Sequence, residues 1–377
     1  MESIWYRFMA SELHVNGRRL MVNSISVSST KITAECQVRL MVPEDNSRWD
    51  DFVMRHPRGG PFHLTAWKKT IQDTFRYEPL YLLAAGTNGI QGILPVFLVK
   101  NPIVGKALIS SPFAVYGGIL AQSDEARHAL YERVKEIGIE NKVEYIELRN
   151  AFPDQCVGAP NVSRYVTFSK ELYGDEAALL ASLPGKTRNK ARKALKEGFT
   201  AHHRVPELNA FFSLYSKVMR RHGTPVFPRK FFECLLNNFG EMADIREVRL
   251  DGKAMAAGLN FYFRDDMHTY YAATDPQFKS TDANTFLYFD SLRWAGENHY
   301  RTFDFGRSKR GTGPFEFKRH WNTVMRELPY EVVLIQRKNL PNFSPANPRF
   351  DIAIRLWRKL PLALTQALGP HLIRLFP

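Results

Sequence analysis

One short stretch combines glycines with cations in the way that an anion-binding loop requires. Residues 303–321 read FDFGRSKRGTGPFEFKRHW, an apolar strand pattern followed by a loop and then a helix that is expected to begin near Phe315. Gly306 is expected to end the strand, and glycine lets a backbone approach a ligand closely. Neither a Walker P-loop nor a G-x-G-x-x-G dinucleotide fingerprint is present. The stretch therefore predicts an anion site, with a solvated turn as the alternative.

The chemistry that suits this stretch is acyl transfer to an amine. Such a reaction requires placement of the amine, a proton acceptor and stabilisation of an oxyanion, but no protein nucleophile. This fits a sequence without an evident Ser/His/Asp arrangement. Asp304 or Glu316 is a candidate base, and Arg307 or Lys318 is a candidate partner for an oxyanion or a phosphate, although Asp304 could instead be a structural partner of Arg307. The predicted catalytic residues are Asp304, Arg307, Lys309 and Lys318, and the predicted substrate contacts nearby are Gly306, Ser308 and Gly311.

A second cationic feature is the run KTRNKARKALK at residues 186–196, which contains six cations and no acid. Like charges one helical turn apart repel each other unless an anion offsets them. The run therefore predicts contact with a phosphate-bearing substrate, and a solvated helix face is the alternative. The residues assigned to this contact are Lys186, Arg188, Lys190, Arg192 and Lys193.

Tyrosines on the predicted strands are further candidates for substrate binding. Tyr270 and Tyr271 are expected to face opposite ways on an alternating strand, so that one is in the core and one lines a cleft. Tyr262 lies on a neighbouring predicted strand. Tyr116 precedes two glycines, which would bring the backbone close to a ligand or form a bulge.

Several separated motifs resemble those of FemAB-like proteins, specifically the branch associated with exosortase/PEP-CTERM systems. They are HPRGGPFH at 56–63, SPFAVYGG at 111–118, YIELRN at 145–150, GTPVFP at 223–228, and FDFGRSKRGTG followed by an aromatic residue and FK. The resemblance runs from roughly residue 38 to 334. It implies an N-acyltransferase that moves an acyl or aminoacyl group to an amine on a cell-envelope or exopolysaccharide precursor. The rival class is a non-catalytic binding protein for a lipid-linked glycan or an RNA.

The order of predicted elements repeats within the chain. One hairpin is expected from strands at 80–85 and 90–99, and extended pieces follow at 106–111 and 115–120. The other is expected from strands at 245–250 and 254–263, and an extended piece follows at 267–273. A helix and a short strand come next in each case, and a repeat this long indicates duplicated domains. Mixed strands and helices predict an α/β (α+β) fold, and the resemblance implies two tandem GNAT-like domains with mixed sheets. The expected division is an N-terminal extension, poorly ordered, at 1–36, domains at 37–168 and 169–338, and a linker with an amphipathic C-terminal tail at 339–377.

Composition restricts the partners. The 377-residue chain has a net charge of +14, which attracts polyanions such as tRNA, nucleotide-linked substrates or anionic lipids. Its three cysteines show no metal-ligand or redox spacing, so we expect no metal and no permanently bound cofactor. The acyl donor is expected as a co-substrate, either acyl-CoA or aminoacyl-tRNA; the Q/R-x-x-G-x-G/A loop of acetyl-CoA enzymes is absent. The oligomeric state is not predicted.

The C-terminal tail differs in character from the rest of the chain. From residue 352 to 360, Ile, Leu and Trp alternate with Arg and Lys, and Pro361 and Pro370 are expected to break the segment. Such a basic amphipathic pattern predicts peripheral contact with an anionic membrane, and docking on the protein's own core is the alternative. We see no signal peptide and no membrane-spanning run, and therefore expect a cytoplasmic protein with this peripheral contact at the inner membrane.

Overall fold

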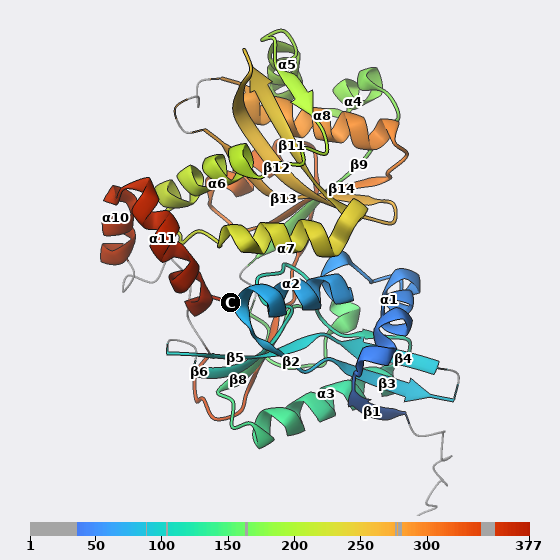
Figure 1. Ribbon diagram of the computed structural model, residues 1–377. Coiled ribbons are helices and arrows are strands. Elements are labelled where there is room, and N and C mark those ends of the chain that lie inside the picture. Colours follow the sequence, from blue (N-terminus) through green and yellow to red (C-terminus); the bar gives the residue numbers. More distant parts are fainter. Residues whose placement is uncertain are drawn as a thin grey trace, which may run out of the picture. The chain divides into compact units, whose positions relative to one another are not determined.

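The computed structural model describes residues 36–377 except 88, 103–104, 163–164, 276, 278–280 and 341–350. The expected N-terminal extension, apart from residue 36, and most of the expected linker lie outside the described residues. The remainder is a mixed α/β structure in which two halves are stacked one above the other (Figure 1). The predicted fold class is confirmed.

The first half contains two mixed or antiparallel sheets and three helices. The four-stranded sheet has the order β1 (Gln37–Leu40), β3 (Leu82–Gly86), β4 (Gly89–Leu94), β7 (Leu120–Ala121). The five-stranded sheet has the order β16 (Glu331–Leu334), β8 (Tyr145–Leu148), β6 (Gly105–Ser110), β5 (Val96–Asn101), β2 (Glu78–Pro79). The helices are α1 (Asn46–Arg55), α2 (Thr65–Phe75) and α3 (Asp124–Glu140).

The second half is built on one seven-stranded sheet. Its order is β10 (Thr200–His202), β11 (Ala243–Leu250), β12 (Lys253–Phe263), β13 (Asp266–Thr274), β14 (Thr302–Ser308), β9 (Val166–Glu171), β15 (Val324–Glu327). The helices that accompany it are α4 (Glu176–Ser182), α5 (Gly185–Ala194), α6 (Asn209–His222), α7 (Arg229–Phe239), α8 (Ala283–Glu297) and α9 (Gly313–Arg319). Two tail helices follow, α10 (Asp351–Lys359) and α11 (Leu362–Leu372).

Both predicted hairpins form, and the repeat extends to the strands that follow them. In each half a helix connects two parallel strands, α3 between β6 and β8 and α8 between β13 and β14. The last paired residues are Ile109 with Glu147 in one half and His268 with Asp304 in the other. A carboxylate therefore stands at the same position of each repeat, where the two parallel strands separate.

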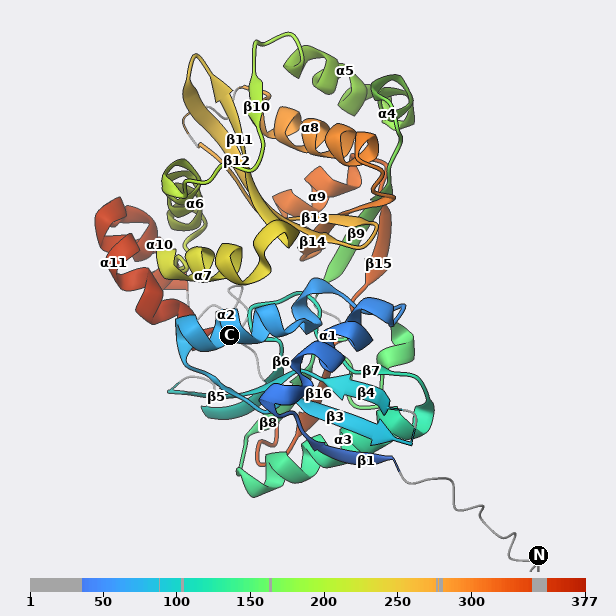
Figure 2. The ribbon, with the colours of Figure 1, turned by 45° about the vertical axis from the view of Figure 1, so that its right-hand side comes forward.

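An aromatic core joins the halves. Helices α2 and α7 lie side by side along the boundary (Figures 1 and 2). Phe62, Trp67, Phe231 and Phe261 are fully buried there, and the rings of Trp67 and Phe231 meet edge to face at 6.0 Å. Such aromatic pairs combine large buried areas with defined geometry. This core holds the walls of any site between the halves in fixed positions.

The chain also crosses between the halves more than once. Strand β9 lies in the larger sheet between β14 and β15, so the expected domain boundary at residue 168 falls inside it. Strand β16 returns to the first half, where it pairs antiparallel with β8. The tail then packs against α6 of the second half.

Four local predictions were wrong. Strand β14 continues past Gly306 to Ser308, with an irregular register between Asp304 and Arg307 and a φ of 70° at the glycine. The strand expected at 90–99 divides at Pro95, which has no N–H to donate to a sheet. Of the extended piece expected at 115–120, only Leu120 is in a strand. Pro370 lies inside α11, whose packing against α6 outweighs the lost hydrogen bond.

Candidate active site

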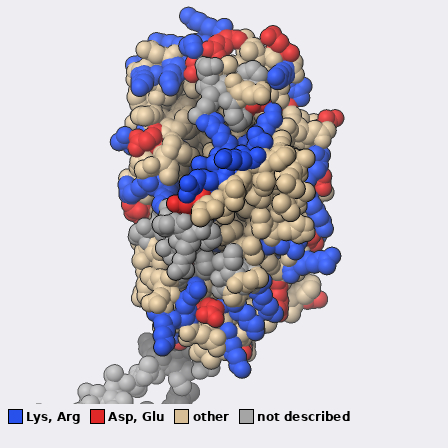
Figure 3. All heavy atoms as spheres, turned by 90° about the vertical axis from the view of Figure 1, so that its left-hand side faces the viewer, with Lys and Arg blue, Asp and Glu red and all other residues tan. Residues whose placement is uncertain are grey.

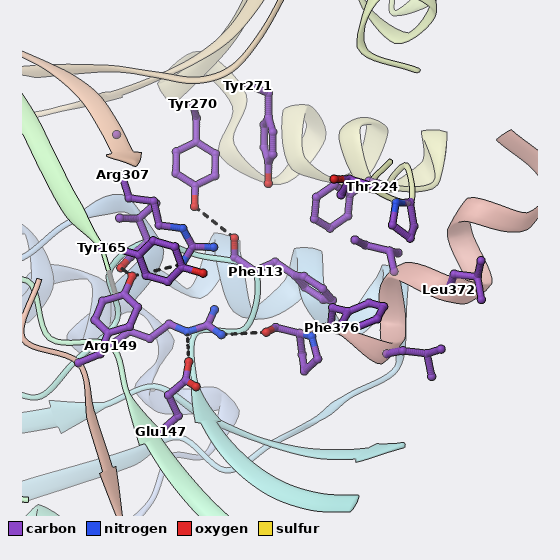
Figure 4. A pocket seen from close by; sticks show the side chains of 18 of the residues that line it. Phe113, Glu147, Arg149, Tyr165, Thr224, Tyr270, Tyr271, Arg307, Leu372 and Phe376 are labelled. Carbon is purple, nitrogen blue, oxygen red and sulfur yellow. Dashed lines mark hydrogen bonds and ion pairs between the residues drawn. The ribbon is translucent and has the colours of Figure 1, made fainter. Parts of the chain in front are cut away.

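A pocket of about 620 Å³ lies between the halves, within the usual size range of small-molecule sites. Its walls come from the first half, from β13, β14 and α9 of the second half, and from the tail. Figure 4 shows lining side chains from both halves and from the tail. Segments far apart in the sequence therefore build it together.

The pocket opens where two parallel strands separate. Strands β13 and β14 pair only from Asp266 to His268 and from Thr302 to Asp304, and residues beyond these points, among them Tyr271 and Gly306, line the pocket. Strand edges that no longer pair with each other offer backbone N–H and C=O groups to a ligand that contains amides. The separation thus creates a place for an extended, amide-bearing donor.

Lys318 is the predicted catalytic residue that is most deeply built into this pocket. Its Nζ donates to the carbonyl oxygens of Gly306 and Arg307, each at 2.9 Å, and its side chain is buried at the pocket wall. Burial lowers the pKa of Lys318 to about 8, and this effect outweighs the attraction of Asp304. An ammonium group has three N–H donors, so one remains for a ligand after the two carbonyl contacts.

Arg307 lines the pocket beside Lys318 and has no carboxylate partner among the described residues. Its guanidinium donates to the hydroxyl of Tyr330 at 3.3 Å and lies 4.6 Å from the ring centre of Tyr165. The alternative role of Asp304 as a structural partner of Arg307 is not observed, because Asp304 pairs with His268. A guanidinium held between two aromatic residues, without an acid, is suited to bind an anion of the substrate.

Asp304 lies behind the pocket and not in it. Its carboxylate accepts hydrogen bonds from the Tyr116 hydroxyl at 2.6 Å and from the Gly306 backbone N–H at 2.6 Å, and it forms an ion pair with His268 at 3.3 Å. Burial alone would raise the pKa of Asp304, but these contacts hold it at about 2, and the same pair raises the pKa of His268 against burial. A carboxylate with this many partners is a weak base. We assign Asp304 the role of positioning Gly306 just beyond the point where β14 stops pairing with β13.

Tyr270 and Tyr271 both line the pocket, contrary to the alternation that the sequence predicts. The register of β13 against β12 shifts at this point: Tyr271 pairs with Leu259 and Thr269 with Asn260, so Tyr270 is an extra residue. This bulge turns both rings to the same side, 4.8 Å apart. The Tyr270 hydroxyl donates to the carbonyl of Phe113 at 3.2 Å, which joins β13 to the first half.

Two charged residues of the pocket, Glu147 on β8 and Arg149 just after it, are not among the predicted site residues. Arg149 is buried; its Nε donates to Glu147 at 2.8 Å and its Nη2 to the Pro377 carbonyl at 2.9 Å. Among the described residues that line the pocket, Glu147 is the one with a carboxylate side chain. Both belong to the motif YIELRN, and the repeat aligns Glu147 with Asp304. This alignment is the sequence signal that could have identified Glu147 as a site residue.

The other residues predicted around the loop lie outside the deep pocket. Ser308 and Lys309 line a shallow hollow that adjoins it and shares Arg307 with it. Arg221 and Arg358 add further positive charge to this hollow, which His222 also lines. Figure 3, which views the left-hand side of Figure 1, shows Lys and Arg side chains gathered near the middle of that face. Gly311 is exposed and lines neither hollow.

Two predicted tyrosines are buried elsewhere. Tyr116 is part of the hydrogen-bonded group around Asp304. Tyr262 donates to Asp244 at 2.8 Å in the interior of the second half. Neither lines the two hollows.

The cationic run forms helix α5 at the outer end of the second half (Figure 1). Lys186, Lys190 and Arg192 are exposed, whereas Lys193 pairs with Glu197 and Asp282, each at 3.0 Å. No residue of α5 lines either hollow. Helix α5 nevertheless lies beside the end of α9, because the Thr187 hydroxyl donates to the carbonyl of His320 at 2.6 Å. Its cations, however, do not reach the pocket beside residues 303–318.

Within the residues that the structure describes, no helix is long and apolar enough to cross a membrane. No group of three or more His, Cys, Asp or Glu side chains in the same residues is placed to hold a metal ion.

Comparison with known proteins identifies the class. Residues 184–319 match the sequence profile of the acetyltransferase (GNAT) domain. This stretch is thus similar to a GNAT domain, and the predicted N-acyltransferase is confirmed. The FemAB-like resemblance is supported in part by the alanyltransferase described below, and the exosortase-associated branch stays a prediction.

Particular relatives are distant in sequence. The UDP-N-acetylmuramoylpentapeptide-lysine N(6)-alanyltransferase of Weissella viridescens is 23% identical over 292 residues, which are 70% of this chain and 84% of that protein. The crystal structure of FemX has a TM-score of 0.65 at 16% identity and covers 80% of this chain and 98% of its own. A tandem GNAT protein from the clavulanic acid biosynthesis pathway has a TM-score of 0.52 at 9% identity, with coverage of 80% and 98%. These structures confirm the tandem GNAT-like fold.

Proposed function

We propose that this protein transfers an acyl or aminoacyl group to an amine on a phosphate-bearing precursor of the cell envelope or of an exopolysaccharide. The observation that carries the proposal is the arrangement of Lys318 and Arg307 at the point where β13 and β14 separate. Neither cation has an acid partner in the part of the chain that the structure describes, and both face a pocket that can hold an amide-bearing donor. The alanyltransferase relative, by its name, acts on a lysine amine of such a precursor, which supports this acceptor class.

The reaction is assigned to residues of this pocket. The acceptor amine attacks the donor carbonyl and a C–N bond forms. The C–O bond to the tRNA or the C–S bond to coenzyme A breaks, and the released oxygen or sulfur takes up a proton. Lys318, in its charged form, donates its third N–H to the developing oxyanion, because the other two are held by backbone carbonyls. Glu147 accepts the proton that the amine loses, because it lines the pocket, which Asp304 does not, and has Arg149 as its ion-pair partner among the described residues, whereas Asp304 is held by several contacts. Arg307 binds a phosphate of the substrate.

The donor is proposed to be aminoacyl-tRNA or acyl-CoA, and the position of α5 favours the former. The exposed cations of α5 lie outside both hollows, so only a large polyanion could contact α5 and the pocket together. Either donor is a cytoplasmic metabolite, and we place the protein there. The exopolysaccharide context, with its exosortase association, rests on the sequence motifs alone.

A transfer assay tests the proposal. Purified protein is incubated with labelled aminoacyl-tRNA or acyl-CoA and with an amine-bearing nucleotide-linked precursor, and labelled product is measured. We expect label to move to the acceptor amine with one donor. A non-catalytic binding protein would consume neither donor while still binding the precursor, and that result would overturn the proposed activity.

A further inference from the structure

The pocket has two chemically different ends. Arg307, Arg149, Glu147 and Tyr165 lie together at one end, whereas Phe113, Tyr271, Leu372 and Phe376 surround the other, as Figure 4 shows. Phe227 and Trp357 add to the apolar lining. Acyl transfer by itself needs the first end only. The apolar end therefore calls for a ligand group that the reaction does not explain.

The apolar end is closed by the tail. Residues of α10 and of the segment after α11, including Trp357 and Ile373, line the pocket and are buried. The hairpin of α10 and α11 docks closely: a Cβ on Gly223 would come within 2.4 Å of Ile354, and one on Gly369 within 2.5 Å of Val226. The tail is therefore docked on the rest of the protein, which is the alternative to membrane contact that the sequence leaves open. The hairpin is thus a fixed wall of the pocket.

The outer face of the same hairpin is apolar as well. Ile352 and Leu356 on α10 are 68% and 61% exposed, and Leu364 and Leu368 on α11 are each 42% exposed. Arg355 and Lys359 lie among them on α10. One helical hairpin therefore presents apolar side chains outward and closes an apolar cavity on its inner side. A hydrocarbon chain that leaves a lipid surface at this hairpin would find its next apolar environment in the pocket.

The polar end of the pocket, where Arg307 lies, opens into the shallow hollow, which is lined by further cations. Arg307 lines both the deep pocket and the shallow hollow, and the hollow adds Arg221, Lys309 and Arg358. Among its described lining residues there is no acid. A phosphate or pyrophosphate bound at Arg307 would stand at the junction of the hollows, with the deep pocket open behind it.

We propose that the pocket binds an anionic amphiphile, with its phosphate at Arg307 and its hydrocarbon chain between Phe113, Leu372 and Phe376. The inference rests on the proposed function, because the chain would belong to the substrate of that same site. Two sources share this chemistry. The chain is either the lipid anchor of the acceptor, as in a prenyl phosphate, or the acyl group of the donor.

Calorimetric titration with alkyl phosphates from hexyl to dodecyl, below their micelle concentrations, tests the inference without turnover. Each methylene that enters the pocket should raise the affinity by about fourfold until the chain fills the cavity. Phe376→Glu should remove this dependence on chain length, whereas Leu364→Glu, on the outer face of the same hairpin, should preserve it. Arg307→Gln should weaken all chain lengths equally. An affinity that does not change with chain length, or equal effects of the two glutamates, overturns the inference.

Displacement separates the two sources. Farnesyl phosphate that displaces dodecyl phosphate, where dodecanoyl-CoA does not, assigns the chain to the acceptor, and the reverse assigns it to the donor. Displacement by neither overturns the inference. Transfer to a short, water-soluble acceptor is measured in parallel. If transfer occurs but the affinity for alkyl phosphates does not depend on chain length, only the amphiphile site is refuted. If the affinity depends on chain length but no transfer occurs, only the enzymatic function is refuted.

Discussion

Replacing Lys318 tests the assigned chemistry most directly. The pKa of this buried side chain is lowered from 10.5 to about 8, and at ~1.4 kcal/mol per unit the folded protein loses about 3 kcal/mol by keeping it charged. Lys318→Met removes this cost together with two hydrogen bonds to carbonyls, so the two changes offset each other. We expect turnover to fall by about a hundredfold or more, because a preorganised oxyanion donor is lost, with little change in the melting temperature.

The pH profile adds a signature that a structural role would not give. Because the pKa of Lys318 in the folded protein is about 8, roughly 90% of this side chain is charged at pH 7, half at pH 8 and about 10% at pH 9. The acceptor amine loses its proton only near pH ~10.4, so its reactive fraction rises with pH across this range. The logarithm of kcat/KM should therefore rise with a slope of one up to about pH 8 and then become flat.

Lys318→Arg is the matched control, because its charge does not titrate in this range. The residual activity of this variant should keep rising through pH 8 to 9 without a break, as should that of Lys318→Met. Wild-type stability should increase between pH 8 and 10.5, since the unfolded state binds the proton more tightly there. Wild-type turnover in the Met variant, loss of turnover only in step with unfolding, or the same break in all three proteins would refute the assignment.

Three further changes test other parts of the proposal. Glu147→Gln keeps the shape of the side chain but not its basicity, and should cut turnover by on the order of a hundredfold; a change in melting temperature alone would make the residue structural. Lys190→Gln with Arg192→Gln should weaken binding of the phosphate-bearing substrate and flatten its salt dependence, and an unchanged slope discards α5 as a phosphate contact. Ile352→Ser with Leu356→Ser should reduce flotation with phosphatidylglycerol vesicles, and partitioning equal to wild type would sink the membrane contact.

Local pattern was sufficient for most elements of the fold. The stripe of Ala126, Leu130, Val134 and Ile137 is buried along α3, and Ser123 caps that helix by accepting a hydrogen bond from the Ala126 N–H. Both hairpins formed where short turns separate strand patterns. Helix periodicity and turn chemistry are properties of neighbouring residues, so a single sequence carries them. The stretch from Gly306 to Lys318 was found in the same way, by its unusual density of glycines and cations.

Only the tertiary structure decided which of these residues meet. Asp304 reaches Tyr116, 188 positions earlier in the chain, and is thereby removed from the pocket, whereas Glu147 of the first half enters it. One inserted residue in β13 turned both Tyr270 and Tyr271 to the same side, and the docking of the tail closed the apolar end. These outcomes depend on how two repeats pack against each other, and the energy of such packing is spread over contacts that no local pattern records.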